Sequence, residues 1–178
     1  MRLIASLAFL LASTANAAVI DFEEYTSNGL YSIASTQGYL LTSDQFYIGI
    51  GPGAGNSYGL GLPSENILTL ANLSSPAFAL ESVDALAFTG SSPLMVTGYF
   101  AAGGQVSTSV AVIGGVDSDM GTYSFSNAWQ GLSSVTFQID ENLNLDNIVV
   151  TAIPIPASVW LFGSALAGLG LIRRKQVA

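Results

Sequence analysis

The feature that most limits how this chain can fold is the length of its apolar runs. Between residues 18 and about 152 the runs are short, and Gly, Ser, Asn and Pro separate them, so no long helical period appears. Several runs alternate apolar and polar residues; Val135, Phe137 and Ile139, for example, share one face of an extended chain. Strand-sized runs at roughly ten-residue spacing predict an all-β body, and we expect a β-sandwich.

The candidate strands are the runs with the strongest apolar or alternating character. They are Val19–Phe22, Tyr39–Thr42, Phe46–Ile50, Ile67–Leu70, Phe78–Leu80, Val83–Phe88, Leu94–Phe100, Val106–Ile113, Thr122–Phe125, Ser133–Ile139 and Leu145–Thr151. The segment from Gly49 to Pro63 is the least strand-like, because it holds six glycines. We predict a surface loop there, and the alternative is a loop that contacts a ligand through Tyr58.

Charge is divided sharply between the ends and the body. All four basic residues lie at the termini (Arg2, Arg173, Arg174 and Lys175), and all twelve acids lie between Asp21 and Asp146. A body without its ends would carry about twelve negative charges and no basic side chain, which excludes nucleic-acid binding because phosphates are repelled. Two interpretations of the acids stay open: they bind cations such as calcium, or they keep a Ser- and Gly-rich domain soluble.

The missing residue types exclude most catalytic chemistry. The chain has no Cys and no His, which rules out zinc sites built from them and removes the usual general base of a nucleophile triad. A pair of carboxylates could still hydrolyse glycosides. The candidate pairs are Asp117 with Asp119 and Asp140 with Glu141, and both are more typical of solvated turns. We therefore predict a protein that is not an enzyme, with a small carboxylate glycosidase as the remote alternative.

The N-terminus has the three parts of a secretory signal. Arg2 precedes the apolar run Leu3–Leu11, and the small-residue site Ala15-Asn16-Ala17 follows. The run is too short to span a bilayer, which needs about 20 residues. We predict a signal peptide over residues 1–17, forming a helix that is removed after Ala17, and an exported domain over residues 18–152.

The C-terminus, residues 153–178, predicts a membrane anchor. Pro154 and Pro156 end the preceding strand, and no residue from Ala157 to Ile172 is charged. Trp160 suits a membrane interface, and Gly163 lies on a side of small residues that permits close helix contact. Arg173 and Arg174 would stay in the cytoplasm, so a single short transmembrane helix would leave the body outside.

These features in this order resemble the PEP-CTERM sorting signal of Gram-negative bacteria. The resemblance rests on Pro154, Pro156, Trp160, Gly163, Arg173 and Arg174. Ile155 stands where the namesake signal has Glu, a variant also familiar in the family. The resemblance implies recognition and cleavage by exosortase in the inner membrane, transient anchoring, then release to the cell surface or exterior. It also implies association with exopolysaccharide or biofilm matrix.

The body is also similar to the jelly-roll domains of carbohydrate-binding modules. Val19-Ile20-Asp21-Phe22-Glu23-Glu24 and Leu145-Asp146-Asn147-Ile148-Val149-Val150 carry the resemblance. In such domains the first and last strands often pair, and acids there can hold a structural calcium ion. The resemblance implies Glu23 and Asp146 as its first ligands, with Asp21 and Glu24 as weaker ones.

Two functions remain open for the body: a structural surface or matrix protein, and a carbohydrate-binding module. Sugar binding usually needs exposed aromatic rings, against which apolar sugar faces stack. Trp129 lies in a polar segment between two strands, which makes it a better candidate for exposure than the other rings; the favoured interpretation is still that it closes the end of the core. The other candidate rings are Tyr58, Tyr47, Tyr99 and Tyr123.

Overall fold

The computed structural model describes residues 17–50, 58–73, 75, 77–88, 90–114, 119–139 and 141–153. The predicted sorting residues 154–174 lie outside this part, as does the signal peptide apart from Ala17. Within the described ranges, no helix has the length and apolar character needed to cross a membrane.

The described residues are almost entirely strands, and no α-helix occurs among them. The strands are β1 (Ala17–Ile20), β2 (Gly29–Thr36), β3 (Tyr39–Ile50), β4 (Tyr58–Leu62), β5 (Ile67–Asn72), β6 (Phe78–Ala87), β7 (Ser92–Phe100), β8 (Gln105–Val112), β9 (Gly121–Ser124), β10 (Leu132–Ile139) and β11 (Leu143–Ala152). One turn of 3₁₀ helix, η1 (Asn127–Trp129), precedes β10. The predicted all-β body is confirmed.

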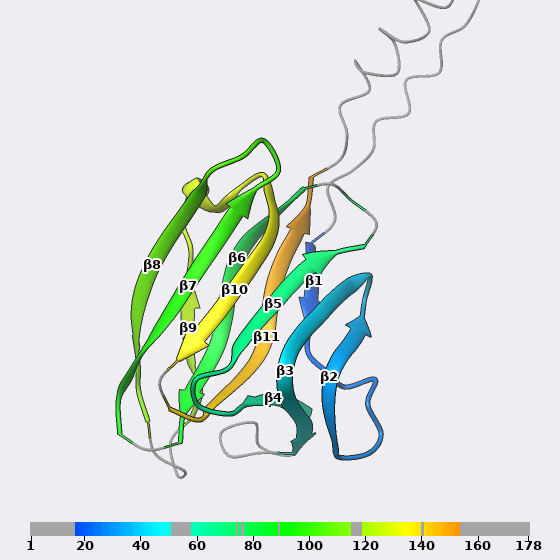
Figure 1. The fold of residues 1–178 in the computed structure, drawn as a ribbon, viewed down its shortest axis with the longest axis vertical. Coiled ribbons are helices and arrows are strands. Elements are labelled where there is room, and N and C mark those ends of the chain that lie inside the picture. The colour runs from blue at the N-terminus through cyan, green and yellow to red at the C-terminus, as the bar shows by residue number, and fades with distance from the viewer. Residues whose placement is uncertain are drawn as a thin grey trace, which may run out of the picture. The chain divides into compact units, whose positions relative to one another are not determined.

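The strands form two layers, which makes the body a β-sandwich (Figure 1). The first sheet has the order β8-β7-β10-β5-β3-β2. The second sheet has the order β9-β6-β11, and both β4 and β1 pair with the far side of β11. All of these pairings are antiparallel. The N-terminal strand β1 and the last strand β11 therefore lie side by side, with Ala17 opposite Thr151.

Strand β3 connects the two layers because it bends in the middle. Its first part, Tyr39–Thr42, pairs with β5 in the first sheet, and its last part, Tyr47–Ile50, pairs with β4, which leads to the second sheet. Against β2, the register shifts between Tyr31 and Ile33, whose partners are Phe46 and Thr42. Extra residues bulge from β3 at this point, and a bulge bends a strand. The two candidate strands Tyr39–Thr42 and Phe46–Ile50 are therefore parts of one bent strand.

The core lies between the sheets and follows the predicted alternation. In β10, Val135 and Phe137 are fully buried, whereas Thr136 and Gln138 face away from the core. Side chains from both sheets form one hydrophobic cluster, which includes Phe46 and Phe137 from the first sheet and Leu80 and Val150 from the second. Short strands with this alternation have one apolar face, and they bury it by packing one sheet against another.

Two strands were missed from the sequence. The loop prediction over Gly49–Pro63 is wrong in part, because β3 runs to Ile50 and Tyr58–Leu62 forms β4. Strand β4 has a loop-like sequence because two of its five residues are glycine, yet it pairs with β3 on one side and with β11 on the other. Strand β2 was missed because it is an edge strand with only Ala34 and Thr36 buried, so its alternation is weak.

Candidate functional site

Trp129 closes one end of the core and does not form an exposed platform. Its side chain is only 4% exposed, and its ring lies 4.8 Å from the Phe125 ring, centroid to centroid, in a tilted arrangement. Trp129 belongs to the hydrophobic core cluster. The favoured interpretation, that this tryptophan closes the end of the core, is confirmed, and its candidacy as an exposed sugar platform is wrong. The polar residues around it form the turn η1, which folds the ring inward.

The candidate tyrosines lie in different places. Tyr58 begins β4 opposite Ile50, and its side chain lies outside the described part of the chain. Tyr99 is exposed on the outer face of the first sheet. Tyr123 is half-buried, and its hydroxyl accepts a 3.1 Å hydrogen bond from the Ile113 N–H. Tyr47 lines a cavity described below.

The acids Glu23 and Asp146, predicted as calcium ligands, are near enough to interact electrostatically. Asp146 is almost fully buried, and burial raises its pKa from 3.8 to about 6. The Asn147 backbone hydrogen bond opposes this shift, whereas the negative charges of Asp84, Glu23 and Asp21 add to it. Among the described residues, no group of three or more acids is placed to hold a metal ion. Calcium binding thus stays a prediction.

The two acid pairs considered for glycoside hydrolysis are only partly described. Asp117 and Asp140 lie outside the described residues. Of their neighbours, Asp119 is exposed and Glu141 is half-buried.

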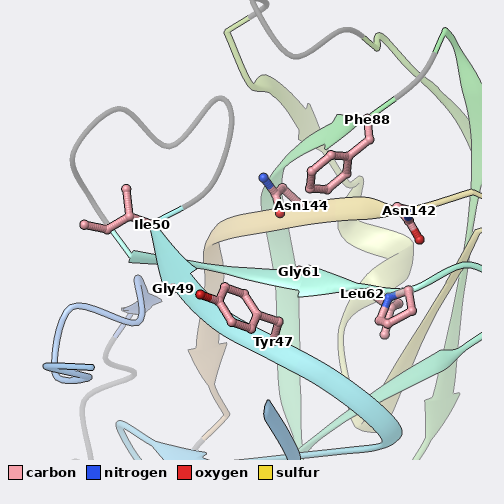
Figure 2. A pocket seen from close by; sticks show the side chains of 9 residues that line it. Tyr47, Gly49, Ile50, Gly61, Leu62, Phe88, Asn142 and Asn144 are labelled. Carbon is pink, nitrogen blue, oxygen red and sulfur yellow. The ribbon is translucent and has the colours of Figure 1, made fainter. Parts of the chain in front are cut away.

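A cavity of about 280 Å³ opens where four strands meet. Its walls come from the end of β3, from β4, from the residue after β6 and from the start of β11. The lining residues are Tyr47, Gly49, Ile50, Gly61, Leu62, Pro63, Phe88, Asn142 and Asn144. In Figure 2 the Tyr47 ring lies on one side of the β4 backbone, and the Phe88 ring and the Asn144 side chain lie on the other. None of the lining side chains is charged.

Gly61 lies at the bottom of the cavity, between Tyr47 on one side and Phe88 with Asn144 on the other. Strand register places it opposite Tyr47 on one side and opposite Asn144 on the other. A Cβ atom built on Gly61 would lie 3.4 Å from Asn144 Oδ1 and 3.7 Å from Tyr47 Cβ, which is ordinary contact distance. The absence of a side chain at this position therefore keeps the space between Tyr47 and Asn144 open.

Close packing fixes the Tyr47 ring. A Cβ atom on Gly49 would lie 2.5 Å from Tyr47 Cε1, so only glycine allows the ring to lie across the strand at this position. The ring is half-buried, with part of its surface facing the cavity. A ring held in this way loses little conformational freedom on binding a ligand.

Hydrogen bonds fix the amide wall. The Ser64 N–H donates to Asn142 Oδ1 at 3.0 Å, and the Phe88 N–H donates to the Asn142 carbonyl at 3.0 Å. With its oxygen held by Ser64, the Asn142 side chain presents its NH₂ group as a donor. The Asn144 side chain, on β11, is buried behind it. The cavity thus combines two aromatic rings with amides and carries no charge.

No protein-family model matches the chain, and no curated protein matches it. Solved structures with a similar arrangement of strands include carbohydrate-binding modules. A family 29 module from Piromyces equi is 14% identical, with a TM-score of 0.47 over 79% of this chain and 93% of its own. The family 11 module of a cellulosomal cellulase from Clostridium thermocellum is 12% identical, with a TM-score of 0.41 over 80% and 97%. One fold hosts many functions, so the function has to be argued from the pocket residues themselves.

Sequence reasoning found one of the pocket residues and missed the others. Tyr47 was a candidate because it is aromatic, but nothing near it in sequence points to Phe88, Asn142 or Asn144. The useful signal was Gly61: an isolated glycine inside a strand often marks a place where another group approaches closely. The glycine-rich context led us to predict a loop instead.

Proposed function

We propose that the body is an exported carbohydrate-binding domain, and that the Tyr47–Phe88 cavity binds one sugar unit of a neutral polysaccharide. The observation that carries this proposal is the pairing of two aromatic rings with the amides of Asn142 and Asn144 in one uncharged cavity. Small-molecule sites are typically apolar cavities with a few fixed polar groups, and their volumes begin at about 300 Å³. A site of this size suits a single ring.

A sugar ring has an apolar face of C–H groups and a rim of hydroxyls. The rings of Tyr47 and Phe88 offer flat apolar surfaces for the face. The Asn142 side chain offers its NH₂ group to a sugar hydroxyl, because its oxygen already accepts from the Ser64 N–H, and Asn144 adds a second polar group to the lining. The arrangement therefore complements both parts of a saccharide.

Charge supports a neutral ligand over an anionic one. The cavity lining has no basic side chain, and the whole chain between residues 18 and 172 has none either. A glycan rich in carboxylate or sulfate groups would be repelled by the acidic protein and would find no basic side chain to pair with. We therefore expect uncharged polysaccharides to bind and acidic ones to be excluded.

The chain ends support an extracellular ligand. The signal-peptide pattern of residues 1–17 and the sorting pattern of residues 153–178 together favour export through the inner membrane and processing by exosortase. A domain delivered in this way meets exopolysaccharide at the cell surface. Binding would then keep the protein in the matrix after its anchor is removed.

Affinity electrophoresis tests the proposal. The full-length protein in mild detergent is run through gels that contain neutral or acidic polysaccharides. We expect neutral glycans to retard the protein, and the Tyr47→Ala and Phe88→Ala variants each to bind about tenfold more weakly, since one aromatic contact contributes roughly 0.5–1.5 kcal/mol beyond its buried area.

Tyr99→Ala is the matched control, because Tyr99 is an exposed tyrosine on β7, a strand that does not line the cavity. Equal loss of binding in Tyr99→Ala and Tyr47→Ala would move the site away from the cavity. If no neutral glycan retarded the protein, the carbohydrate-binding role would be rejected, and a structural surface protein would be left as the explanation for the export signals.

A further inference from the structure

The sequence of β8 is symmetric about its centre. From Val106 to Val110 it reads Val-Ser-Thr-Ser-Val, with Thr108 in the middle. Two antiparallel strands that cross at Thr108 would place each residue opposite an identical one: Thr108 opposite Thr108, serine opposite serine and valine opposite valine. A two-fold interface uses the same patch on both subunits, and such a strand is self-complementary by construction.

Strand β8 is also an edge strand with one open side. Among the described strands it pairs only with β7, and Figure 1 shows it at the border of the first sheet. The Phe100 N–H donates to the Gly104 carbonyl, and Pro93, which has no N–H, lies opposite Ala111. Hydrogen-bonded and non-hydrogen-bonded residue pairs alternate along an antiparallel ladder. The backbone N–H and C=O groups of residues 106, 108, 110 and 112 therefore point toward β7, and those of residues 105, 107, 109 and 111 point toward the open edge.

The middle of this edge is accessible. A groove of about 490 Å³ runs beside it, lined on the β8 side by Thr108, Ser109 and Val110 and on the other side by residues of β9 and the following turn. Strand β9 belongs to the second sheet and pairs with β6, so it leaves the β8 edge uncovered at this point. Only beyond β8 is the edge closed, where the Ile113 N–H donates to the Tyr123 hydroxyl.

Natural edge strands usually carry a charge or a proline that blocks pairing with another chain. Strand β8 has neither, and no charged residue lies in β7 or β10 beside it. The acids of this chain repel a second copy elsewhere on the surface, so this uncharged border is where two acidic copies can meet.

We infer that two copies of this chain associate through antiparallel pairing of their β8 strands, with the two-fold axis at Thr108. The first sheets of the two copies then form one continuous sheet. Ser107 of each copy lies opposite Ser109 of the other and exchanges backbone hydrogen bonds with it, because both have their backbone groups on the open edge. Val106 lies opposite Val110 on the core side, and the hydroxyls of the facing serines pair on the outer side.

A second copy fits this edge better than an unrelated strand does. An extended peptide of another protein could use the same backbone groups, but it would not need the Val-Ser-Thr-Ser-Val symmetry. The other edge of the first sheet, β2, is also uncharged, but it has no such symmetry and is bulged against β3. The pairing is independent of the proposed sugar site, which lies on other strands.

Cysteine cross-linking of the full-length protein tests the register, because the natural chain has no cysteine. Facing residues at a non-hydrogen-bonded position have Cα atoms about 4.5 Å apart, within the range of about 4.4–6.8 Å that a disulfide requires. We expect Thr108→Cys to give a disulfide-linked dimer under mild oxidation. The Ser107→Cys/Ser109→Cys double variant should do so as well.

Gln105→Cys is the control, since two copies of this exposed position would lie about 20 Å apart in the paired strands. Adding Ser109→Pro to Thr108→Cys should lower the cross-linked fraction at least about tenfold, because proline removes an N–H that only the dimer uses. Thermal melting of the Ser109→Pro variant checks that the monomer still folds. Cross-linking of Gln105→Cys at the same rate as Thr108→Cys, or no cross-linking of Thr108→Cys, would overturn the inference.

Discussion

The backbone N–H of Asn147 donates a 2.8 Å hydrogen bond to Oδ1 of the neighbouring Asp146. Asn147 has a positive φ of 44°, and its side-chain amide donates to Asp84 Oδ2 at 2.9 Å. Asparagine tolerates this left-handed conformation better than most residues. The register of β11 against β6 shifts at the same place, between Asp146 and Val149. One asparagine thus holds two carboxylates at a bulge that buries one of them.

The buried carboxylate predicts that the folded body is more stable in mild acid. The folded-state pKa of Asp146 is raised to about 6, above the value of 3.8 in an unfolded chain. Its stabilising contribution is therefore complete below pH 3.8 and is lost as the pH rises through about 6. The loss amounts to as much as about 3 kcal/mol of unfolding free energy between pH 4 and pH 7. Urea unfolding across this pH range measures it.

Asp146→Asn should flatten that pH dependence, and Asp119→Asn, an exposed acid, should leave it as in the natural protein. An unchanged pH profile in Asp146→Asn would assign the dependence to another group.

Calcium gives a further comparison at pH 7. If Glu23 and Asp146 bind the ion, calcium should raise the melting temperature of the natural protein and not that of Asp146→Asn.

Gly61→Ala separates sugar binding from folding. The added methyl group meets Asn144 Oδ1 at 3.4 Å, so the strand accepts it, and alanine reduces the freedom of the unfolded chain. We expect the unfolding free energy to stay the same or to rise by about 0.4–1 kcal/mol. Because the methyl group occupies the cavity floor, polysaccharide affinity should fall about tenfold. Calorimetric melting and affinity electrophoresis of one preparation measure both, and full binding in a stable Gly61→Ala variant would argue against the cavity.

Trp129→Ala should affect stability and not recognition. Truncating a buried tryptophan typically costs about 3–5 kcal/mol, through lost burial and the cavity left behind. The Phe125 ring, 4.8 Å away, would lose its partner. Denaturant unfolding gives the cost, and binding below the melting temperature should match that of the natural protein. A stable variant that had lost its glycan affinity would restore Trp129 as a ligand residue.

Removing residues 154–178 tests the sorting hypothesis. Ile153 is the right end point, because its N–H donates to the Ala77 carbonyl and its own carbonyl accepts from the Ser75 hydroxyl. We expect the truncated protein to lose its membrane association and to reach a different location from the full-length form in a bacterium that has exosortase. Fractionation with immunoblotting gives the distribution, and the same distribution for both forms would refute the anchor.

The sandwich could be predicted because its cause is local. Alternation such as that of Val135, Thr136 and Phe137 is visible in one strand at a time, and burial between two sheets follows from it. Strand β4 could not be predicted, because two of its five residues are glycine and its pairing with β3 and β11 depends on residues far away in the sequence. Its local sequence is a loop sequence, and tertiary packing overrides it.

The site could not be predicted, because it depends on the register between paired strands, which the sequence does not show. Tyr47 and Asn144 are far apart in the chain and meet only because both lie opposite Gly61. Trp129 shows the converse: its neighbours in the sequence are polar, but a single 3₁₀ turn directs its ring into the core. Polar surroundings in sequence describe the backbone position and not the direction of the side chain.

Strand β11 determines how the body would respond to mechanical force. It lies between β6 on one side and β4 and β1 on the other, and it is the last strand before residue 154. A pull from the C-terminal side along the strand would act on hydrogen bonds at both of its borders at once, whereas a pull on the four-residue β1 would act at one border only. Forced unfolding is governed by the unfolding rate. A cell that tethers this protein by its C-terminal side would therefore load a strand that is hydrogen-bonded along both of its borders.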